Sequence, residues 1–472
     1  MPRVLLLATT TGYQTRSFGE AAARLGVELV FATDRCAVLD DPWSDHAIAI
    51  RFFDEERSIA AILDRPGTDR VDGVLVVGDR PTVIAARVAQ ALGLPGHSPD
   101  AAAIARNKQM MRIRLRDAGL PVPWFQSVAV GDEPAAIRDE PSAISHQPLS
   151  YPCIVKPVAL SGSRGVMRAN DRAELAAAFD RLRALLRSPD IRAERNEAHE
   201  TALIEEFIPG REYAIEALLH HGELRVLAIF DKPDPLDGPF FEETLYVTPS
   251  AAPAAVQDAI VRGVAAAARA IGLHHGPIHA ECRVNDSGVF VLEVAARPIG
   301  GLCARALRFA GIRDSGFETR HRGLGMHVSA FRARNTTPNS QIPTTDAVIP
   351  LEELLLRHAL GESPDAWTRE PDASGVMMIP IPRRGFLRRV DGVDAAREVA
   401  HVTDVRITAK PDHLLAPLPE GASYLGFIFA RAAAPLAVER ALRDAHARLT
   451  FAIDPELPVL TASQSRYNRA HG

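Results

Sequence analysis

The chain has 472 residues, of which 47% are hydrophobic and 24% are charged, and its formal net charge is −5. This composition is typical of globular proteins, and the length suffices for about three domains, each with its own core. The negative net charge and the lack of a basic stripe argue against nucleic-acid binding. No apolar run approaches the length of a membrane span, so we expect no membrane partner.

The cysteine pattern is that of a reduced protein. The four cysteines form no CxxC pair, and their neighbours are apolar or small: Cys36, Cys153, Cys282 and Cys303. We therefore expect free, mostly buried thiols. Residues 1–8 are too short and too quickly followed by polar residues to form a signal peptide, so we expect a cytoplasmic protein.

The first hundred residues alternate between strand and helix patterns. Strands are predicted at 4–8, 27–32 and 73–77, and helices at 17–25, 59–63 and 81–92. Such alternation predicts a parallel sheet with helices on both faces, and ligands bind at the loops that follow its strands. The segment lacks a GxGxxG motif, so a dinucleotide site is not supported. A scaffold domain with one modest substrate loop is an equally good interpretation.

Two lysines in the next part of the chain are placed to meet an anion. Lys108 lies in the first turn of a helix predicted at 107–118, where a cation opposes the helix dipole unless it has an anionic partner. Lys156 ends a strand predicted at 151–156 and is followed by the small-residue loop 161–166. Such a loop can present consecutive N–H groups to a phosphate, and a nearby lysine adds a point charge. An exposed lysine and an ordinary hairpin turn are the structural alternatives.

The middle of the chain carries carboxylates at strand ends. A helix is predicted at 171–187, strands at 202–207, 212–219 and 224–230, and a long helix at 253–272. Glu205 and Glu206 end one strand and Glu212 begins the next, so this bend could hold the two hydroxyls of a ribose or form a solvated edge. The proline-rich segment 231–250 looks irregular, yet it carries Lys232, Glu242 and Glu243, and charged loops often carry function.

Residues 276–301 form the most informative stretch. Strands at 278–284 and 289–295 flank a turn of Asn-Asp-Ser-Gly, which predicts a hairpin. Because strand side chains alternate between faces, Glu281 and Glu293 should lie opposite each other on one face. Two facing carboxylates are costly without a cation or proton between them, and Mg2+ is the natural hard cation. Arg297 follows the hairpin and could hold a phosphate. A pair of surface carboxylates is the alternative.

The remainder of the chain reads as an α+β unit after a long polar segment. Helices are predicted at 302–309, 350–360, 393–401 and 435–449, and strands at 377–380, 385–390, 405–408 and 425–430. The segment 311–348 is long, polar and interrupted by glycine and proline. Loops of this length are usually lids or disordered segments.

Several of these segments together resemble the ATP-grasp superfamily. The resemblance covers roughly residues 1–310 and rests on five stretches in the expected order: GLPGHSPDAAAIARNKQMMRIRLRDAGLPVP, YPCIVKPVALSGSRGV, LIEEFIPGREYAIEA, GPFFEE and HAECRVNDSGVFVLEVAARPIGG. It implies an α/β and α+β architecture with a Rossmann-like domain at 1–100, a small ATP-clamping lobe at 101–207, a large lobe with the metal site at 208–348, and a C-terminal α+β domain at 349–472.

The resemblance also implies roles for individual residues. Lys108 and Lys156 would contact the phosphates of ATP, and Arg297 would stabilise the transferred phosphoryl group, which makes Arg297 and Lys156 the candidate catalytic residues. The flexible phosphate flap would include Ser161, Gly162, Ser163, Gly165 and Val166. The adenine slot would be lined, mainly by backbone groups, by Glu205, Glu206, Phe207 and Ile208, and Glu212 would hold the ribose. Glu281 and Glu293 would bind Mg2+, with Mn2+ as a substitute.

One position departs from the common ATP-grasp pattern. Many members carry Asn two residues after the last metal-binding glutamate, where this chain has Ala295. The branch of carboxylate–amine ligases similar to L-amino acid ligases also differs there and adds an upstream glutamate. Glu243 is the candidate for that third ligand, with Glu242 as the substitute. Relative to that branch, 311–348 looks like an insertion.

The resemblance predicts an ATP-dependent carboxylate–amine ligase that forms an amide or peptide bond through an acyl phosphate. Its substrates would be a small carboxylic acid and an amine, and His279, Tyr246 and residues 300–302 would shape their pocket. Two alternatives stay open: a bicarbonate-phosphorylating carboxylase of the biotin carboxylase type, and a nucleotide-binding protein without catalysis. The sequence leaves a homodimer open and does not identify the acid or the amine.

Overall fold

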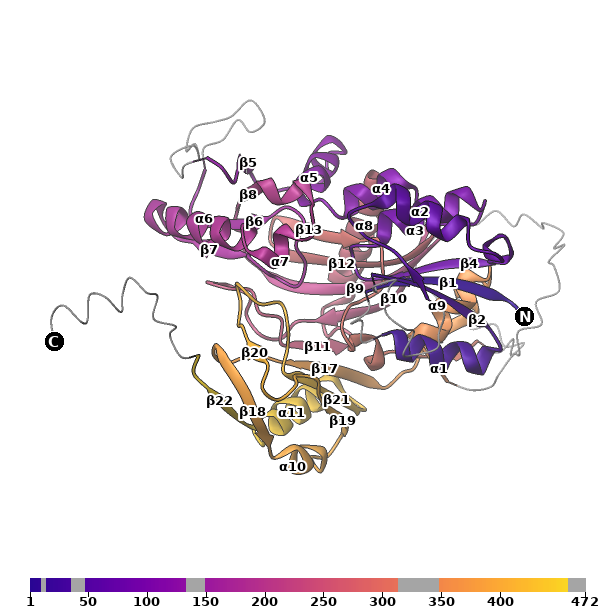
Figure 1. Cartoon of the computed structure of the whole chain (residues 1–472). Helices are drawn as coiled ribbons and strands as arrows, with labels where there is room; N and C mark the ends of the chain where they lie inside the picture. Colours follow the sequence, from indigo (N-terminus) through magenta and orange to yellow (C-terminus); the bar gives the residue numbers. More distant parts are fainter. Residues whose placement is uncertain (10–13, 35–46, 133–148, 313–347, 457–472) are drawn as a thin grey trace, which may run out of the picture.

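The computed structural model describes residues 1–9, 14–34, 47–132, 149–312 and 348–456. Within these ranges three larger sheets and two small ones form the body of the protein (Figure 1). Of the four cysteines, Cys153, Cys282 and Cys303 are free and buried, as predicted, and Cys36 lies outside the described residues. None of the helices in these ranges is long and apolar enough to cross a membrane.

The first sheet is parallel, with the strand order β3-β2-β1-β4. Its strands are β1 (Arg3–Ala8), β2 (Glu28–Thr33), β3 (Ile48–Ala49) and β4 (Gly73–Val77), and its helices are α1 (Thr15–Leu25), α2 (Glu55–Leu63) and α3 (Thr82–Ala91). Alternate residues of β1 pack against α1 on one face and against α2 and α3 on the other. The predicted parallel sheet with helices on both faces is therefore confirmed.

The second sheet is antiparallel, with the order β5-β8-β6-β7. Its strands are β5 (Phe125–Ala129), β6 (Cys153–Pro157), β7 (Met167–Ala169) and β8 (Thr201–Glu206). The neighbouring helices are α4 (Pro99–Ala105), α5 (Lys108–Asp117), α6 (Arg172–Leu186) and α7 (Pro189–Arg192). The side chain of Asn107 caps α5 by accepting from the N–H of Met110, which places Lys108 in the first turn, as predicted.

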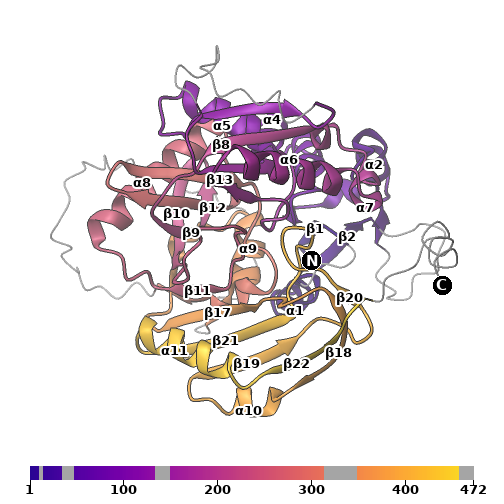
Figure 2. The ribbon, with the colours of Figure 1, turned by 90° about the vertical axis from the view of Figure 1, so that its left-hand side faces the viewer.

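The third sheet has eight antiparallel strands in the order β13-β12-β9-β10-β11-β17-β21-β19. They are β9 (Arg211–His220), β10 (Glu223–Asp231), β11 (Leu245–Thr248), β12 (Gly276–Asn285), β13 (Gly288–Ala295), β17 (Ala373–Ile379), β19 (Val402–Ile407) and β21 (Gly426–Ala432), accompanied by α8 (Ala254–Ile271) and α11 (Pro435–His446). In Figure 2 the C-terminal strands extend the sheet beyond β11. The sheet thus crosses the predicted boundary at 348, and the domain division stays a prediction.

Two small sheets complete the described part of the chain, with orders β15-β14-β16 and β20-β18-β22. Their strands are β14 (Arg308–Gly311), β15 (Ile349–Pro350), β16 (Trp367–Arg369), β18 (Gly385–Asp391), β20 (Leu414–Leu415) and β22 (Thr450–Asp454), and the remaining α-helices are α9 (Leu351–Ala359) and α10 (Val393–Arg397). The lid or insertion predicted at 311–348 lies almost wholly outside the described residues.

Two segments differ from the sequence-based expectations. The helix predicted at 302–309 is a single 3-10 turn, Cys303–Ala306, followed by β14. Leu307 and Phe309 are both buried, and a spacing of two residues fits a strand that buries one face rather than a helix. The segment 231–250, expected to be irregular, contains β11, whose four residues are all buried in the large sheet. A strand this short gives too weak a pattern to recognise.

Candidate active site

A cavity of about 530 Å³ lies where the three larger sheets meet. Thr9 and Gly78, which follow β1 and β4, line it from the parallel sheet, whereas binding of a ligand by these loops stays a prediction. The second sheet contributes the end of β6 and the loop after it, and the third sheet contributes β12 and β13. The cavity is therefore enclosed by parts of the chain that are distant in sequence.

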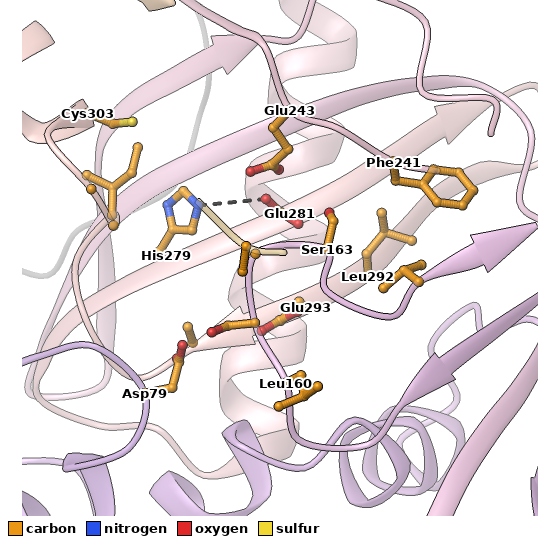
Figure 3. Close-up of a pocket in the computed structure, with 18 of the residues that line it drawn as sticks. Asp79, Leu160, Ser163, Phe241, Glu243, His279, Glu281, Leu292, Glu293 and Cys303 are labelled. Atoms are coloured by element: carbon orange, nitrogen blue, oxygen red, sulfur yellow. Dashed lines mark ion pairs between the residues drawn. The ribbon is translucent and has the colours of Figure 1, made fainter. Parts of the chain in front are cut away.

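The hairpin β12–β13 places two glutamates on the cavity wall. Glu281 and Glu293 are directly opposed in the strand register, which confirms the predicted pairing. The register shifts beside them, because Cys282 pairs with Val291 and leaves Leu292 as an extra residue in β13. Such a bulge re-aims side chains, and both Leu292 and Glu293 line the cavity. In Figure 3, Glu243, Glu281 and Glu293 follow one another along this wall.

Three carboxylates gather around one lysine in this wall. One carboxylate oxygen from each of Glu212, Glu243 and Glu281 lies within 4.8 Å of the other two. Lys232 Nζ lies 2.8 Å from Glu212 Oε1 and 2.9 Å from Glu281 Oε1, and it also contacts Glu243. The hydroxyl of Tyr246 donates to Glu243 over 2.9 Å. Burial disfavours the ammonium of Lys232, but the three carboxylates raise its pKa well above the usual value.

The charges of Glu243 and Glu281 are coupled. Burial and the neighbouring Glu281 raise the pKa of Glu243 to about 8, whereas Lys232 lowers the pKa of Glu281 despite burial. At neutral pH the pair therefore holds a proton, which a divalent cation could replace. A set of carboxylate oxygens fits Mg2+. Glu242 lies outside this cluster and accepts from the backbone of Ile381.

The two predicted phosphate lysines reach the cavity from different elements. Lys108 Nζ lies 3.2 Å from Glu293 Oε2 and donates to the carbonyl of Leu160 over 2.8 Å. Lys156, in β6, pairs with the buried carboxylate of Glu205. Burial is the main cause that lowers the pKa of Lys156 to about 8, although Glu205 opposes it. The structure thus brings both lysines to the same cavity as the acidic wall.

Two cations, Arg112 and Lys156, form ion pairs with Glu205. Arg112 in α5 donates to it over 2.9 and 3.3 Å and also to the carbonyls of Val291 and Leu292 over 3.1 and 3.0 Å. Burial would raise the pKa of Glu205, but Arg112 and Lys156 hold it at about 2. Arg112 therefore joins α5, β8 and β13, and the side chain of Glu205 positions Lys156.

The predicted flap and adenine slot line one end of the cavity. The loop 161–166 is attached to the C-terminal part of the chain, because the N–H of Gly165 donates to Pro419 over 2.8 Å. Gly165 has φ +76°, and a Cβ there would lie 2.9 Å from Leu182, so a larger residue would be strained at this position. Apolar side chains surround this end: Ile154, Val166, Phe207, Ile208, Phe241 and Leu292.

The backbone and side chains near this slot are partly engaged within the protein. The N–H groups of Glu206 and Phe207 donate to the carbonyls of Trp124 and Pro152. Arg283, in β12, pairs with Glu212 over 2.9 Å and donates to the carbonyl of Ile208 over 2.8 Å. Glu212 is therefore shared between Arg283 and the acidic cluster, and its predicted contact with a ribose stays a prediction.

Arg297 lines the cavity and is held there by Asp79, which follows β4 of the parallel sheet. Its guanidinium forms two hydrogen bonds with Asp79, of 2.9 and 3.0 Å. Burial opposes the charge of Arg297, but Asp79 raises its pKa above the usual value, and Arg297 in turn lowers the pKa of Asp79 despite burial. The arginine is thus permanently charged and fixed in orientation at the edge of the cavity.

A buried pair of His279 and Glu216 lies beside the acidic wall. His279 Nδ1 is 3.1 Å from Glu216 Oε2, and its Nε2 is 3.9 Å from Glu281 Oε1 (dashed line in Figure 3). Glu216 has no exposed surface and also accepts from the N–H of Ile299 over 3.1–3.2 Å. Burial raises the pKa of Glu216. The position predicted to depart from the family pattern, Ala295, pairs with His279 in the hairpin.

Five charged side chains at or beside this cavity were not among the predicted site residues: Asp79, Arg112, Glu216, Lys232 and Arg283. Asp79 carried the clearest signal, since it follows a strand of a parallel sheet. Glu216 and Arg283 share the alternation of their strands with Glu212 and Glu281. Arg112 meets Glu205 across 93 positions of sequence, a distance at which no local pattern operates.

Comparisons with known proteins match three parts of the chain. Residues 149–306 match the ATP-grasp domain, residues 19–96 the ATP-grasp N-terminal domain, and residues 377–454 the L-amino acid ligase C-terminal domain 2. The crystal structure of an L-amino acid ligase from Bacillus licheniformis is similar over 96% of this chain and 99% of that chain, with a TM-score of 0.71 and 24% identity. At that identity the likeness concerns the fold.

Proteins of similar sequence include a named synthase and a named ligase. Carnosine synthase 1 of Gallus gallus is 31% identical over 50% of this chain and 25% of its own length. Alanine–anticapsin ligase of Bacillus subtilis is 28% identical over 54% of this chain and 52% of its own length. The chain therefore spans about half or less of these two relatives.

Proposed function

Because the chain belongs to the carboxylate–amine ligase branch of the ATP-grasp superfamily, we propose that it joins two amino acids, or an amino acid and another small carboxylic acid, through an acyl phosphate. The chain is an ATP-dependent ligase that forms C–N bonds. The identity of its substrates and the roles of individual residues are the proposed part.

The observation that carries this proposal is the convergence of acids and bases on one cavity. Glu243, Glu281 and Glu293 line this cavity, and the same cavity is lined by three cations: Lys108, Lys156 and Arg297. Phosphoryl transfer depends on positioning and charge neutralisation more than on covalent help from the protein. Mg2+ bound by the glutamates would hold the phosphates of ATP and neutralise their charge.

The first step activates the carboxylic acid. A carboxylate oxygen attacks the γ-phosphorus of ATP, the new O–P bond forms as the bond to ADP breaks, and an acyl phosphate results. Lys156 and Lys108 would hold the phosphates as point charges, and Arg297 would hold the transferred group through its planar guanidinium. Asp79 fixes Arg297 in the required orientation. The apolar end near Phe207 and Phe241 would hold the adenine ring.

The second step forms the amide. The nitrogen of the amine attacks the acyl carbonyl, phosphate leaves, and the nitrogen loses one proton. We assign the acceptance of that proton to His279, because it lines the cavity and Glu216 fixes its ring through Nδ1. General bases of this kind need a defined orientation at the reacting atom.

The part of the cavity lined by Tyr246, Met378 and Phe427 would bind the two substrates. These aromatic and apolar side chains suit the apolar part of an amino acid. A Cβ added at Gly300 would meet no atom within 4 Å, so this residue borders open space. At Gly301, with φ +61°, a Cβ would lie 3.2 Å from the ring of Phe427, so the backbone conformation and this close contact both favour glycine.

Turnover with defined substrates tests the proposal. The protein is incubated with Mg-ATP and either amino-acid pairs or bicarbonate, and ADP, phosphate and product masses are measured. We expect ADP together with a product whose mass is the sum of the two substrates minus water. ADP formation with bicarbonate alone would instead identify a carboxylase. Tight ATP binding with no ADP from any mixture would identify a nucleotide-binding protein without catalysis.

A further inference from the structure

A histidine cluster lies at the end of the large sheet opposite to the acidic wall. Six histidines make up the cluster, and four of them form two pairs that are adjacent in sequence: His97, His220, His221, His274, His275 and His358. Glu281 pairs with Ala214 in β9, six residues before His220, so the cluster is roughly 20 Å from the acidic wall at about 3.3 Å per strand residue. The cluster is therefore separate from the proposed active site.

Three of these histidines converge on one point. His220 ends β9, His275 precedes β12, and His358 lies in the last turn of α9. Each offers a ring nitrogen, and these nitrogens lie within 4.8 Å of one another. His220 Nδ1 is 3.2 Å from His358 Nε2, and the rings of His275 and His358 stack with centroids 4.4 Å apart.

These separations match the coordination sphere of a small transition-metal ion. Two nitrogens bound tetrahedrally to Zn2+ at about 2.0–2.1 Å lie about 3.3 Å apart, because the edge of a tetrahedron is about 1.6 times the bond length. The 3.2 Å contact between His220 and His358 is close to that edge. His275 must approach by at most about 1.5 Å, which a change in its side-chain torsions can supply.

The surroundings favour neutral imidazoles, which are the form that binds metals. His275 and His358 are 5% and 2% exposed. Burial and the neighbouring histidines lower the pKa of His275 to about 4 and that of His358 to about 3. His220 is only partly buried and lies at the turn between β9 and β10, which provides a path from solvent.

We propose that His220, His275 and His358 bind one late first-row divalent cation, most suitably Zn2+, with water or His221 as the fourth ligand. Three histidine nitrogens suit Zn2+, Ni2+ and Co2+ rather than Mg2+. The bound ion would connect α9 with β9 and β12, which lie beside one another in Figures 1 and 2. Its role would be to fix α9 against the large sheet.

Metal titration of the untagged full chain tests this site. The protein is first treated with a chelator, and ZnCl2 or CoCl2 is then added in excess Mg2+, which occupies carboxylate sites but competes weakly for imidazoles. We expect one Zn2+ per chain, the visible absorption of tetrahedral Co2+, and a rise in Tm with Zn2+. The conservative variants His220→Gln and His358→Gln should each weaken Zn2+ binding by about 100-fold or more.

The matched control is His413→Gln, which changes an exposed histidine on another part of the chain. It should leave the stoichiometry, the Co2+ spectrum and the Tm shift unchanged. His220→Gln changes a partly exposed residue, so this variant should fold even if His358→Gln does not. Equal Zn2+ binding in His220→Gln and the unaltered chain, or no saturable binding in the unaltered chain, would show that the cluster is only a stack of neutral imidazoles.

Discussion

The substitution Glu293→Gln separates catalysis from folding most cleanly. Glu293 lies opposite Glu281 in the hairpin, its side chain is 24% exposed, and its ion pair with Lys108 measures 3.2 Å. A partly exposed ion pair contributes about 0–1 kcal/mol to stability, so the variant should fold normally. Glutamine keeps the shape of the side chain and removes only its charge.

The expected loss of activity follows from that charge. At about 4 Å, a unit charge is worth about 1 kcal/mol in bulk water and about 4 kcal/mol at an effective dielectric constant of 20. The partial exposure of Glu293 places it between these limits, so we expect about 2–3 kcal/mol of lost transition-state stabilisation. This corresponds to roughly a 30- to 150-fold fall in kcat.

The assay is steady-state ADP release with saturating substrates, accompanied by urea unfolding of the same preparation. The control is Glu223→Gln, which removes a carboxylate that is 68% exposed at the far end of β10. This control should retain full activity and stability. A Glu293→Gln variant with the kcat of the unaltered chain would refute the assignment of Glu293 to the metal site.

Three further substitutions or conditions test other parts of the site. Arg297→Lys keeps the charge but loses the bidentate hydrogen bonding with Asp79, so kcat should fall about 10²-fold. An unchanged kcat would argue against a role for the planar guanidinium of Arg297. Burial and Glu281 raise the pKa of Glu243 to about 8, so Mg2+ binding at pH 7 should release up to one proton. Below pH 8, the affinity for Mg2+ should increase about tenfold for each unit by which the pH is raised. Calorimetry in buffers of different ionisation enthalpy measures the proton release, and finding none would contradict this prediction. Arg112→Met leaves a buried carboxylate with one partner, so the free energy of unfolding should fall by about 3–5 kcal/mol, and a loss below about 1 kcal/mol in urea unfolding would contradict it.

The elements that the sequence predicts well are those governed by local rules. The turn Asn285–Gly288 and the alternation on both sides of it determine the hairpin, and the register observed for Glu281 and Glu293 follows from them. Asn107 signals the start of α5 and so the place of Lys108. Lys108 also has the anionic partner that its position against the helix dipole predicted.

The features that the sequence does not predict depend on tertiary contacts. Lys232 comes from a segment that looks irregular, and only the fold places it among Glu212, Glu243 and Glu281. The crossing of the large sheet past residue 348 depends on β11 pairing with β17, two strands separated by more than a hundred residues. No periodicity in the sequence specifies such a pairing.

The fate of one oxygen atom tests the central claim most directly. If the carboxylic acid is activated as an acyl phosphate, an amino acid labelled with ¹⁸O in its carboxylate should transfer one labelled oxygen to inorganic phosphate for each amide formed. Mass spectrometry of the released phosphate measures this transfer. Unlabelled phosphate accompanying labelled amide would contradict the proposed mechanism.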